Sequence, residues 1–121
     1  MDGKFFRLGE RQFYPKGVTY GSFAPGPDQS GFPPRARVES DFQQMRALNA
    51  NTLRVYTVPP RWLLDLAHAH ELKLLVDLPW WKTGCFLDSA EMRTAARKVV
   101  SDAMAVCARH PAVFAISLVN E

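Results

Sequence analysis

The C-terminal stretch of the chain, residues 112–121, most limits what the sequence can fold into. It follows the helix-breaking pair His110-Pro111 and stays almost wholly apolar until Asn120 and Glu121 end it. An uninterrupted apolar run of this length is typical of a parallel strand that is buried on both faces. Since reactive groups lie at the carboxyl ends of such strands in parallel α/β folds, Glu121 is a candidate functional residue.

Upstream of this run, strand-like and helix-like segments alternate. Short β-branched, aromatic or apolar runs predict strands at residues 17–21, 51–57 and 72–78. Amphipathic segments predict a helix after each of these strands. The apolar stripes of the three helices are Val38, Phe42, Met45 and Leu48, then Leu63, Leu66 and Ala67, then Met92, Ala96, Val99, Ala103 and Val106.

Local signals mark where these elements begin and end. Asn49 suits a left-handed cap after the first helix, and Pro59-Pro60 favours the start of the second. Asp88, with Glu91 three residues later, has the spacing of a capping box for the third.

The N-terminal part of the chain adds a hairpin and a long loop. Residues 4–8 and 11–14 flank Gly9 and predict two short antiparallel strands. Six prolines and glycines within residues 23–34 exclude regular structure there. A loop in this position, after a strand, is either a functional loop or a surface excursion.

The predicted order is therefore a hairpin followed by β-α-β-α-β-α-β, an α/β fold with a parallel sheet. Four strands alone leave two unpaired edges, which natural proteins avoid or cover. We expect residues 1–121 to form the N-terminal half of an eight-unit (β/α)8 TIM barrel, which needs roughly 250 residues. A complete small doubly wound domain is the alternative.

Composition excludes few function classes. The net charge is +3, but the basic residues are scattered, so we do not expect nucleic-acid binding. No apolar run is long enough to span a membrane, and the N-terminus lacks a signal pattern, which leaves the compartment open. Cys85 and Cys107 lack metal-ligand spacing, and His68 and His70 point to different faces of a helix. We expect neither a metal nor a cofactor.

Three motifs occur in order on the predicted elements: Gly9 with Gly17-Val18 near the N-terminus, residues 51–57 (NTLRVYT) on the second strand, and His110-Pro111 leading to Asn120-Glu121. Together they resemble the clan of retaining (β/α)8 glycoside hydrolases. The second-strand motif is most similar to that of enzymes acting on β-glucans, including β-1,3-glucan hydrolases and transglycosylases.

The resemblance implies roles for three residues. Glu121 would be the general acid/base, Asn120 would bind the sugar hydroxyl next to the anomeric carbon, and Arg54 would support the nucleophile electrostatically. The nucleophile would be a second glutamate on strand seven, which this chain does not contain. Retaining chemistry needs both carboxyl groups, about 5–5.5 Å apart, so we expect the isolated chain to be inactive.

Other residues near the predicted strand ends are candidates for substrate binding. Aromatic rings there can stack on the apolar face of a sugar or pack under loops. Asp77 can bind a sugar hydroxyl or form a structural ion pair. The aromatic candidates are Tyr20, Tyr56, Trp80 and Trp81.

Strand alternation divides the last run between two faces. Glu121, Ser117 and Ala115 share one face, whereas Asn120 falls on the other, so both catalytic candidates reach one site only if the strand end twists or bulges. We expect the small residues to face a barrel interior, and Phe114, Ile116 and Leu118 to meet the helices.

The sequence thus favours part of a glycosidase or transglycosidase whose substrate is a β-linked oligosaccharide or polysaccharide. The competing class is a non-catalytic half-barrel that binds oligosaccharide or self-associates through its open sheet edges.

Overall fold

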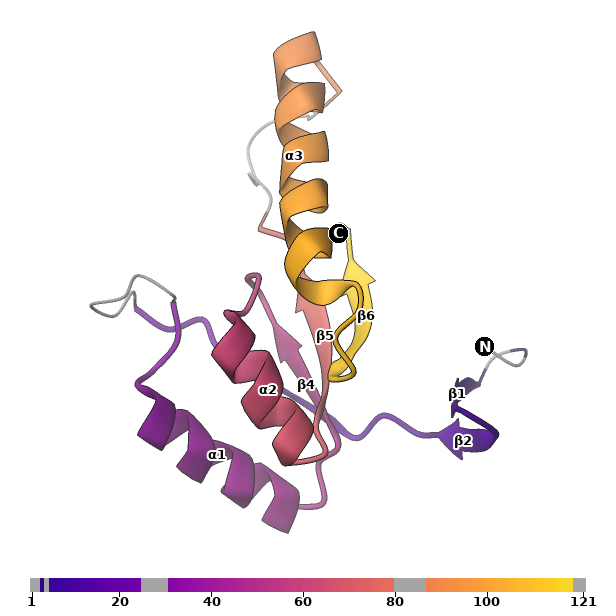
Figure 1. Cartoon of the computed structure of the whole chain (residues 1–121), viewed down its shortest axis with the longest axis vertical. Coiled ribbons are helices and arrows are strands. Elements are labelled where there is room, and N and C mark those ends of the chain that lie inside the picture. Colours follow the sequence, from indigo (N-terminus) through magenta and orange to yellow (C-terminus); the bar gives the residue numbers. More distant parts are fainter. Residues whose placement is uncertain (1–2, 4, 25–30, 80–86, 119–121) are drawn as a thin grey trace.

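The computed structural model describes residue 3 and residues 5–24, 31–79 and 87–118 of the chain. These residues form a two-stranded hairpin, a four-stranded parallel sheet and three helices (Figure 1). The elements are β1 (Phe6–Leu8), β2 (Arg11–Phe13), β3 (Gly17–Thr19), α1 (Arg35–Ala47), β4 (Thr52–Val55), α2 (Arg61–Ala69), β5 (Lys73–Asp77), α3 (Ala90–Cys107) and β6 (Val113–Ser117).

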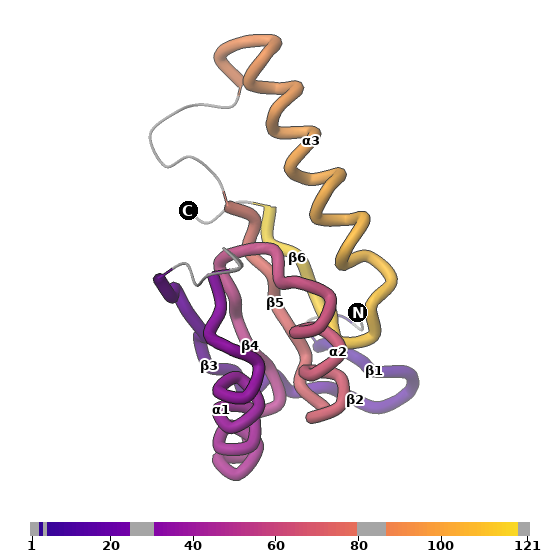
Figure 2. Tube along the Cα trace, turned by 60° about the vertical axis from the view of Figure 1, so that its left-hand side comes forward, coloured from indigo at the N-terminus to yellow at the C-terminus, as the bar shows by residue number. Residues whose placement is uncertain are grey.

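The parallel strands follow one another in the sheet in the order of the chain, β3-β4-β5-β6 (Figure 2). Because β-α-β crossovers are right-handed, strands added in one direction place their helices on one face of the sheet. A doubly wound domain would reverse its strand order and cover both faces. In the described residues the strand order is not reversed, and all three helices pack on one face of the sheet. The doubly wound alternative is therefore wrong for this part of the chain. The arrangement is consistent with part of a (β/α)8 barrel.

Strand alternation places the hydrophobic core on the helix-bearing face of the sheet. Leu53 and Val55 of β4 and Leu74 and Val76 of β5 are fully buried there. All three helices reach the same cluster. They contribute Val38 and Phe42 from α1, Leu63, Leu64, Leu66 and Ala67 from α2, and Cys107 from α3.

The opposite face of the sheet is not covered by these helices. The register places Arg54 beside Leu75, Leu75 beside Ala115, and Asp77 beside Ser117 on this face. None of these five residues belongs to the core cluster as far as the chain is described. We call it the open face. Ala115 and Ser117, which were expected to face a barrel interior, lie on this face.

The predicted ends of the first two helices are close to those observed. Asn49 follows α1 with a φ of 63°, the left-handed conformation expected of a cap. Pro60 is the N-terminal cap residue of α2, one position before the helix begins. Glu71 also has a positive φ, 56°, and ends α2 in the same way without a sequence signal.

The start of α3 differs from the prediction by one residue. Ser89, and not Asp88, is the cap, and its hydroxyl accepts a hydrogen bond from the Met92 amide at 3.1 Å. Glu91 lies in the first helical turn. The backbone amide there and the Ser89 hydroxyl lower the pKa of the Glu91 carboxyl.

Helix α3 extends well past the sheet, so its predicted apolar stripe is only partly used (Figure 1). Ala103 and Cys107, near its C-terminal end, are buried, whereas Val106 is exposed. The placement of Val106 on the inward stripe is therefore wrong, because Cys107 takes that position. Burial also raises the pKa of the Cys107 thiol.

A register shift near the start of β6 changes the surroundings of Phe114. Leu74 pairs with Val113 and Leu75 with Ala115, which leaves Phe114 between them as the extra residue. Its ring contacts Phe6 and Phe13 of the hairpin, with centroid distances of 4.7 and 5.5 Å. Phe114 was expected to meet the helices, and this prediction is wrong.

The two residues expected beside Phe114 on the helix-bearing face behave differently from one another. Ile116 packs against the core cluster as predicted. Leu118 is 53% exposed and does not join the core cluster of the described residues.

His110 holds the turn before β6 through two hydrogen bonds that the sequence did not predict. Its side chain is buried, and its Nδ1 accepts a hydrogen bond from the Ala112 amide at 3.2 Å. Nε2 therefore carries the proton and donates to Asp65 Oδ1 of α2 at 3.0 Å. This hydrogen bond lowers the pKa of Asp65 and ties α2 to the turn before β6.

None of the helices in the described residues is long and apolar enough to cross a membrane.

Candidate functional site

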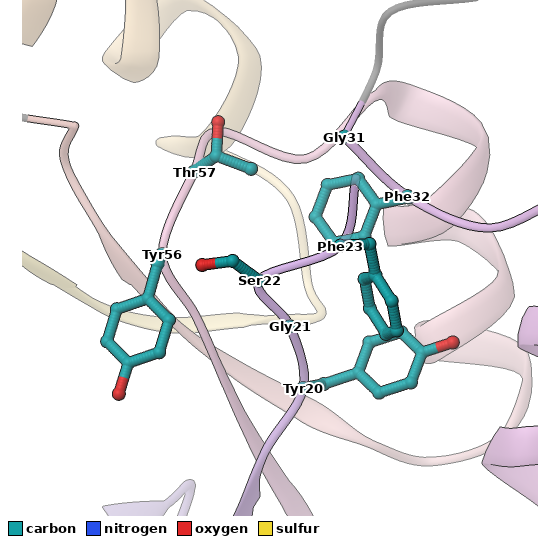
Figure 3. A pocket seen from close by; sticks show the side chains of 8 residues that line it. All are labelled: Tyr20, Gly21, Ser22, Phe23, Gly31, Phe32, Tyr56 and Thr57. Carbon is teal, nitrogen blue, oxygen red and sulfur yellow. The ribbon is translucent and has the colours of Figure 1, made fainter. Parts of the chain in front are cut away.

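The carboxyl ends of the four parallel strands lie along one edge of the sheet, where a pocket of about 210 Å³ opens. It is enclosed by the segments that follow β3 and β4 and by Gly31 and Phe32, which precede α1 (Figure 3). A sheet of this topology is expected to bind ligands in this position. The lining residues are Tyr20, Gly21, Ser22, Phe23, Gly31, Phe32, Tyr56 and Thr57.

One wall of the pocket is aromatic and continuous with the core. Tyr20 is only 5% exposed, and its ring packs edge-on against Phe23 at 4.8 Å and Phe42 at 5.6 Å. Its hydroxyl donates to Asp41 at 2.8 Å, pointing away from the pocket (Figure 3). Burial, together with that hydrogen bond, raises the pKa of Tyr20. The ring of Tyr20 therefore packs in the core, with little surface left for a sugar.

The other wall is more polar and more accessible. Tyr56 follows β4 and is 37% exposed, so part of its side chain is accessible. The Ser22 hydroxyl points toward the side of Tyr56, whereas the Thr57 hydroxyl points away from the aromatic wall (Figure 3). A ring that can stack, next to two hydroxyls that can donate or accept, is a combination suited to a small polyhydroxylated ligand.

Arg54 and Asp77 form an ion pair on the open face, next to the strand end that carries Tyr56. Arg54 Nε and Nη2 both donate to Asp77 Oδ2, at 2.9 and 2.6 Å. Asp77 is only 2% exposed, and its Oδ1 has no hydrogen-bond partner among the described residues. The structural ion pair that the sequence left open for Asp77 is thus present.

The Arg54 guanidinium also lies over the ring of Tyr56, with its central carbon 5.0 Å from the ring centroid. The two hydrogen bonds to Asp77 and this cation–π contact together fix the orientation of the guanidinium group. Arg54, Tyr56 and Asp77 are therefore brought together, as a site at these strand ends requires.

The remaining predicted site residues cannot be placed in this way. Trp80, Trp81, Asn120 and Glu121 lie outside the described residues, and so does Cys85. Within the described part, no group of three or more metal-ligating side chains comes together.

The sequence did not single out Ser22, Phe23, Phe32 or Thr57 as site residues. A signal for the first of these was present in Gly21, whose φ of 112° turns the chain directly after β3. Gly31 and Thr57 are far apart along the chain, and both line the pocket.

Comparisons with known proteins give a fold and no family. No family model matches the chain, and no curated protein matches it. Among solved structures, the crystal structure of a GH5_18 from Bifidobacterium longum subsp. infantis is similar, with a TM-score of 0.60 and 18% sequence identity. The match covers 81% of this chain and 32% of that chain, so the chain spans about a third of the length of its structural relative. At this identity the similarity shows a shared fold, in agreement with a partial (β/α)8 arrangement.

Proposed function

We propose that this chain forms the N-terminal half of a retaining β-glycosidase or transglycosidase barrel that acts on β-glucans. The observation that carries the proposal is the position of Arg54. It lies at the carboxyl end of β4, on the open face, held by Asp77 and stacked on Tyr56. The GH5 assignment of the structural relative and the Asn120-Glu121 motif after β6 support the same conclusion.

In this proposal the two carboxyl groups of the reaction come from different halves of the barrel. Glu121 protonates the leaving oxygen and later activates water or an acceptor sugar, and Asn120 binds the neighbouring hydroxyl. A second glutamate, on strand seven and outside residues 1–121, attacks the anomeric carbon, and Arg54 keeps that carboxylate charged. Asp77 would then act by orienting Arg54.

The pocket between the β3 and β4 strand ends would bind a sugar unit of the β-glucan. Tyr56 would supply a stacking face, and Ser22 and Thr57 would bind hydroxyl groups. Trp80 and Trp81 follow β5 in the sequence, and they stay predicted sugar contacts.

Two experiments on the purified 121-residue chain test this proposal. The first is turnover of an aryl β-glucoside, which we expect to be absent, since only one of the two required carboxyl groups is available. Measurable turnover would contradict that division of roles.

The second experiment is titration with β-1,3- and β-1,4-gluco-oligosaccharides, followed by NMR. We expect Tyr56→Ala to weaken binding by about tenfold, because a stacking contact with an aromatic ring is worth on the order of 1 kcal/mol. Tyr14→Ala is the matched control, since Tyr14 is exposed on the hairpin. Equal affinities for both variants would remove the pocket from the proposal.

A non-catalytic carbohydrate-binding half-barrel is the second candidate. The composition of the pocket favours it, because none of the described lining residues carries a carboxyl group. An epoxyalkyl β-glucoside separates the two candidates, since its epoxide can esterify a carboxylate beside a bound sugar. A catalytic role predicts labelling of Glu121 that excess oligosaccharide prevents. A purely binding role predicts oligosaccharide binding without that label.

A further inference from the structure

Tyr56 belongs both to the pocket at the strand ends and to the surroundings of the Arg54–Asp77 ion pair. It is one of the residues that line the pocket, and it is 37% exposed. The Arg54 guanidinium lies over the same ring, with its central carbon 5.0 Å from the ring centroid. One aromatic side chain therefore connects the candidate sugar site to the arginine of the candidate catalytic site.

The contact with Arg54 decides which part of the ring a sugar can use. An aromatic ring has two faces, and the guanidinium occupies one of them. A sugar unit that stacks on Tyr56 must therefore use the face turned away from Arg54. The ring would then lie between the sugar and the guanidinium, in contact with both.

Arg54 has two arrangements that such a sugar can distinguish. In the observed one, its guanidinium is paired with Asp77 and stacked on Tyr56. In the other, the guanidinium turns toward water, which a side chain that is 35% exposed can reach. A ligand shifts such an equilibrium only by binding one arrangement more tightly than the other. A stacked sugar does so, because it needs the ring held in place, and because it keeps water away from the cation–π contact and so strengthens it.

Asp77 takes part in this arrangement without contacting the sugar. It is 2% exposed, and both donors of Arg54 bind its Oδ2. Its other oxygen, Oδ1, is also buried. A ligand in the pocket therefore does not reach the Asp77 carboxylate, and an effect of Asp77 on sugar affinity has to pass through Arg54.

We propose that the ring of Tyr56 couples sugar binding in the pocket to the orientation of Arg54, with Asp77 as a positioning residue. This inference rests on the proposed function and deepens it. A sugar unit in the pocket would organise the arginine that keeps the nucleophile charged, so that binding energy from that unit is used at the reacting centre. Coupling of this kind is reciprocal, so the ion pair should raise the affinity for sugar by the factor by which sugar stabilises the pair.

A double-mutant cycle on the 121-residue chain tests the coupling, with the affinity for a β-1,3-gluco-oligosaccharide measured by NMR titration. We expect Asp77→Asn to weaken binding about threefold, in the wild type and in Tyr56→Phe alike, because both keep the ring. In Tyr56→Ala it should cause no further loss. Asp65→Asn is the matched control, since it removes a paired carboxylate from α2, and it should leave the affinity unchanged.

The resonance of the Arg54 Nε–H group gives a second readout, which a merely structural role of Asp77 would not move and which needs no substitution at Asp77. We expect saturating oligosaccharide to shift this resonance in the wild type and in Tyr56→Phe, and to leave it unchanged in Tyr56→Ala. Circular dichroism shows whether each variant keeps its helices, so loss of affinity is separated from loss of folding.

The outcomes distinguish a failure of the coupling from a failure of the proposed function. Oligosaccharide binding that Asp77→Asn weakens equally in the wild type and in Tyr56→Ala overturns the coupling alone. An Arg54 resonance that bound sugar does not shift has the same meaning. A wild-type chain that binds no oligosaccharide overturns the coupling together with the sugar pocket of the proposed function.

Discussion

Arg54 and Asp77 show at the residue scale how burial decides what an ion pair contributes. Asp77 is almost fully buried, whereas the Arg54 side chain is 35% exposed. Removing the arginine leaves a buried carboxylate without its two donors. Removing the carboxylate leaves a guanidinium that can still reach water. The two substitutions should therefore have unequal costs.

We expect Arg54→Met to lower the free energy of unfolding by about 3–5 kcal/mol, the usual cost of breaking a buried pair. Asp77→Asn should cost roughly 1–2 kcal/mol, since water screens the partly exposed arginine. Urea unfolding measures both. The double variant should lose less than the sum of the two. A larger loss for Asp77→Asn than for Arg54→Met would contradict this account of the pair.

Tyr20 gives a pH-dependent prediction. Burial and the hydrogen bond to Asp41 raise its pKa in the folded state, whereas in the unfolded state it titrates near its ordinary value of about 10. Its contribution is therefore complete below about pH 10 and is lost as the pH rises above that value. Tyr20→Phe should be less stable at pH 8, by about 1 kcal/mol for the lost bond, and should lose less stability between pH 9 and 11.

Urea midpoints at several pH values check this prediction, with Tyr14→Phe as the control. The Tyr14 hydroxyl donates to Gln12, an exposed residue. An alkaline loss of the same size in wild type and Tyr20→Phe would show that Tyr20 does not carry the effect.

The sequence predicted the position of the candidate site residues at the strand ends more reliably than the contacts that their side chains make. Tyr20 and Tyr56 both follow strands, yet one ring packs in the core and the other is accessible. Which of the two occurs depends on Phe42 of α1, and the sequence does not state how that helix packs. For Asp77 the sequence left open a sugar hydroxyl or a structural ion pair. The register of β4 with β5 places Arg54 close enough to form the ion pair.

At the scale of elements, the start of α3 shows that capping signals locate a helix start to within about one residue. Asp88 and Ser89 are both good cap residues, and the Asp88–Glu91 spacing favoured the wrong one. The Ser89 hydroxyl accepts from the Met92 amide, so Ser89→Ala should cost about 1 kcal/mol in the free energy of unfolding. Asp88→Ala should change it by only a few tenths. Thermal unfolding of the two variants compares them directly, and the reverse order would assign the cap to Asp88.

Repetitive patterns predicted most elements, and irregular features caused the errors. The hairpin around Gly9, the turn at Asn49 and the buried face of α2 followed from periodicity and from φ preferences. The contact of Phe114 with the hairpin did not, because it depends on an extra residue in β6 that has no sequence signature. The exposed part of α3 likewise depends on how far the sheet extends beneath it.

At the scale of the whole molecule, four sequential parallel strands have the core cluster of the described residues on one face of the sheet. The carboxyl ends of these strands lie together at one end of the sheet, where they provide the candidate sugar site.

The central claim is that Glu121 and Arg54 face the same sugar site, and a crystal structure of the chain with a bound β-gluco-oligosaccharide tests it most directly. We predict a sugar unit stacked on Tyr56 in the pocket, with the side chains of Glu121 and Arg54 both directed toward the ligand. A ligand bound elsewhere, or a Glu121 side chain directed toward the helix-bearing face, would contradict the claim.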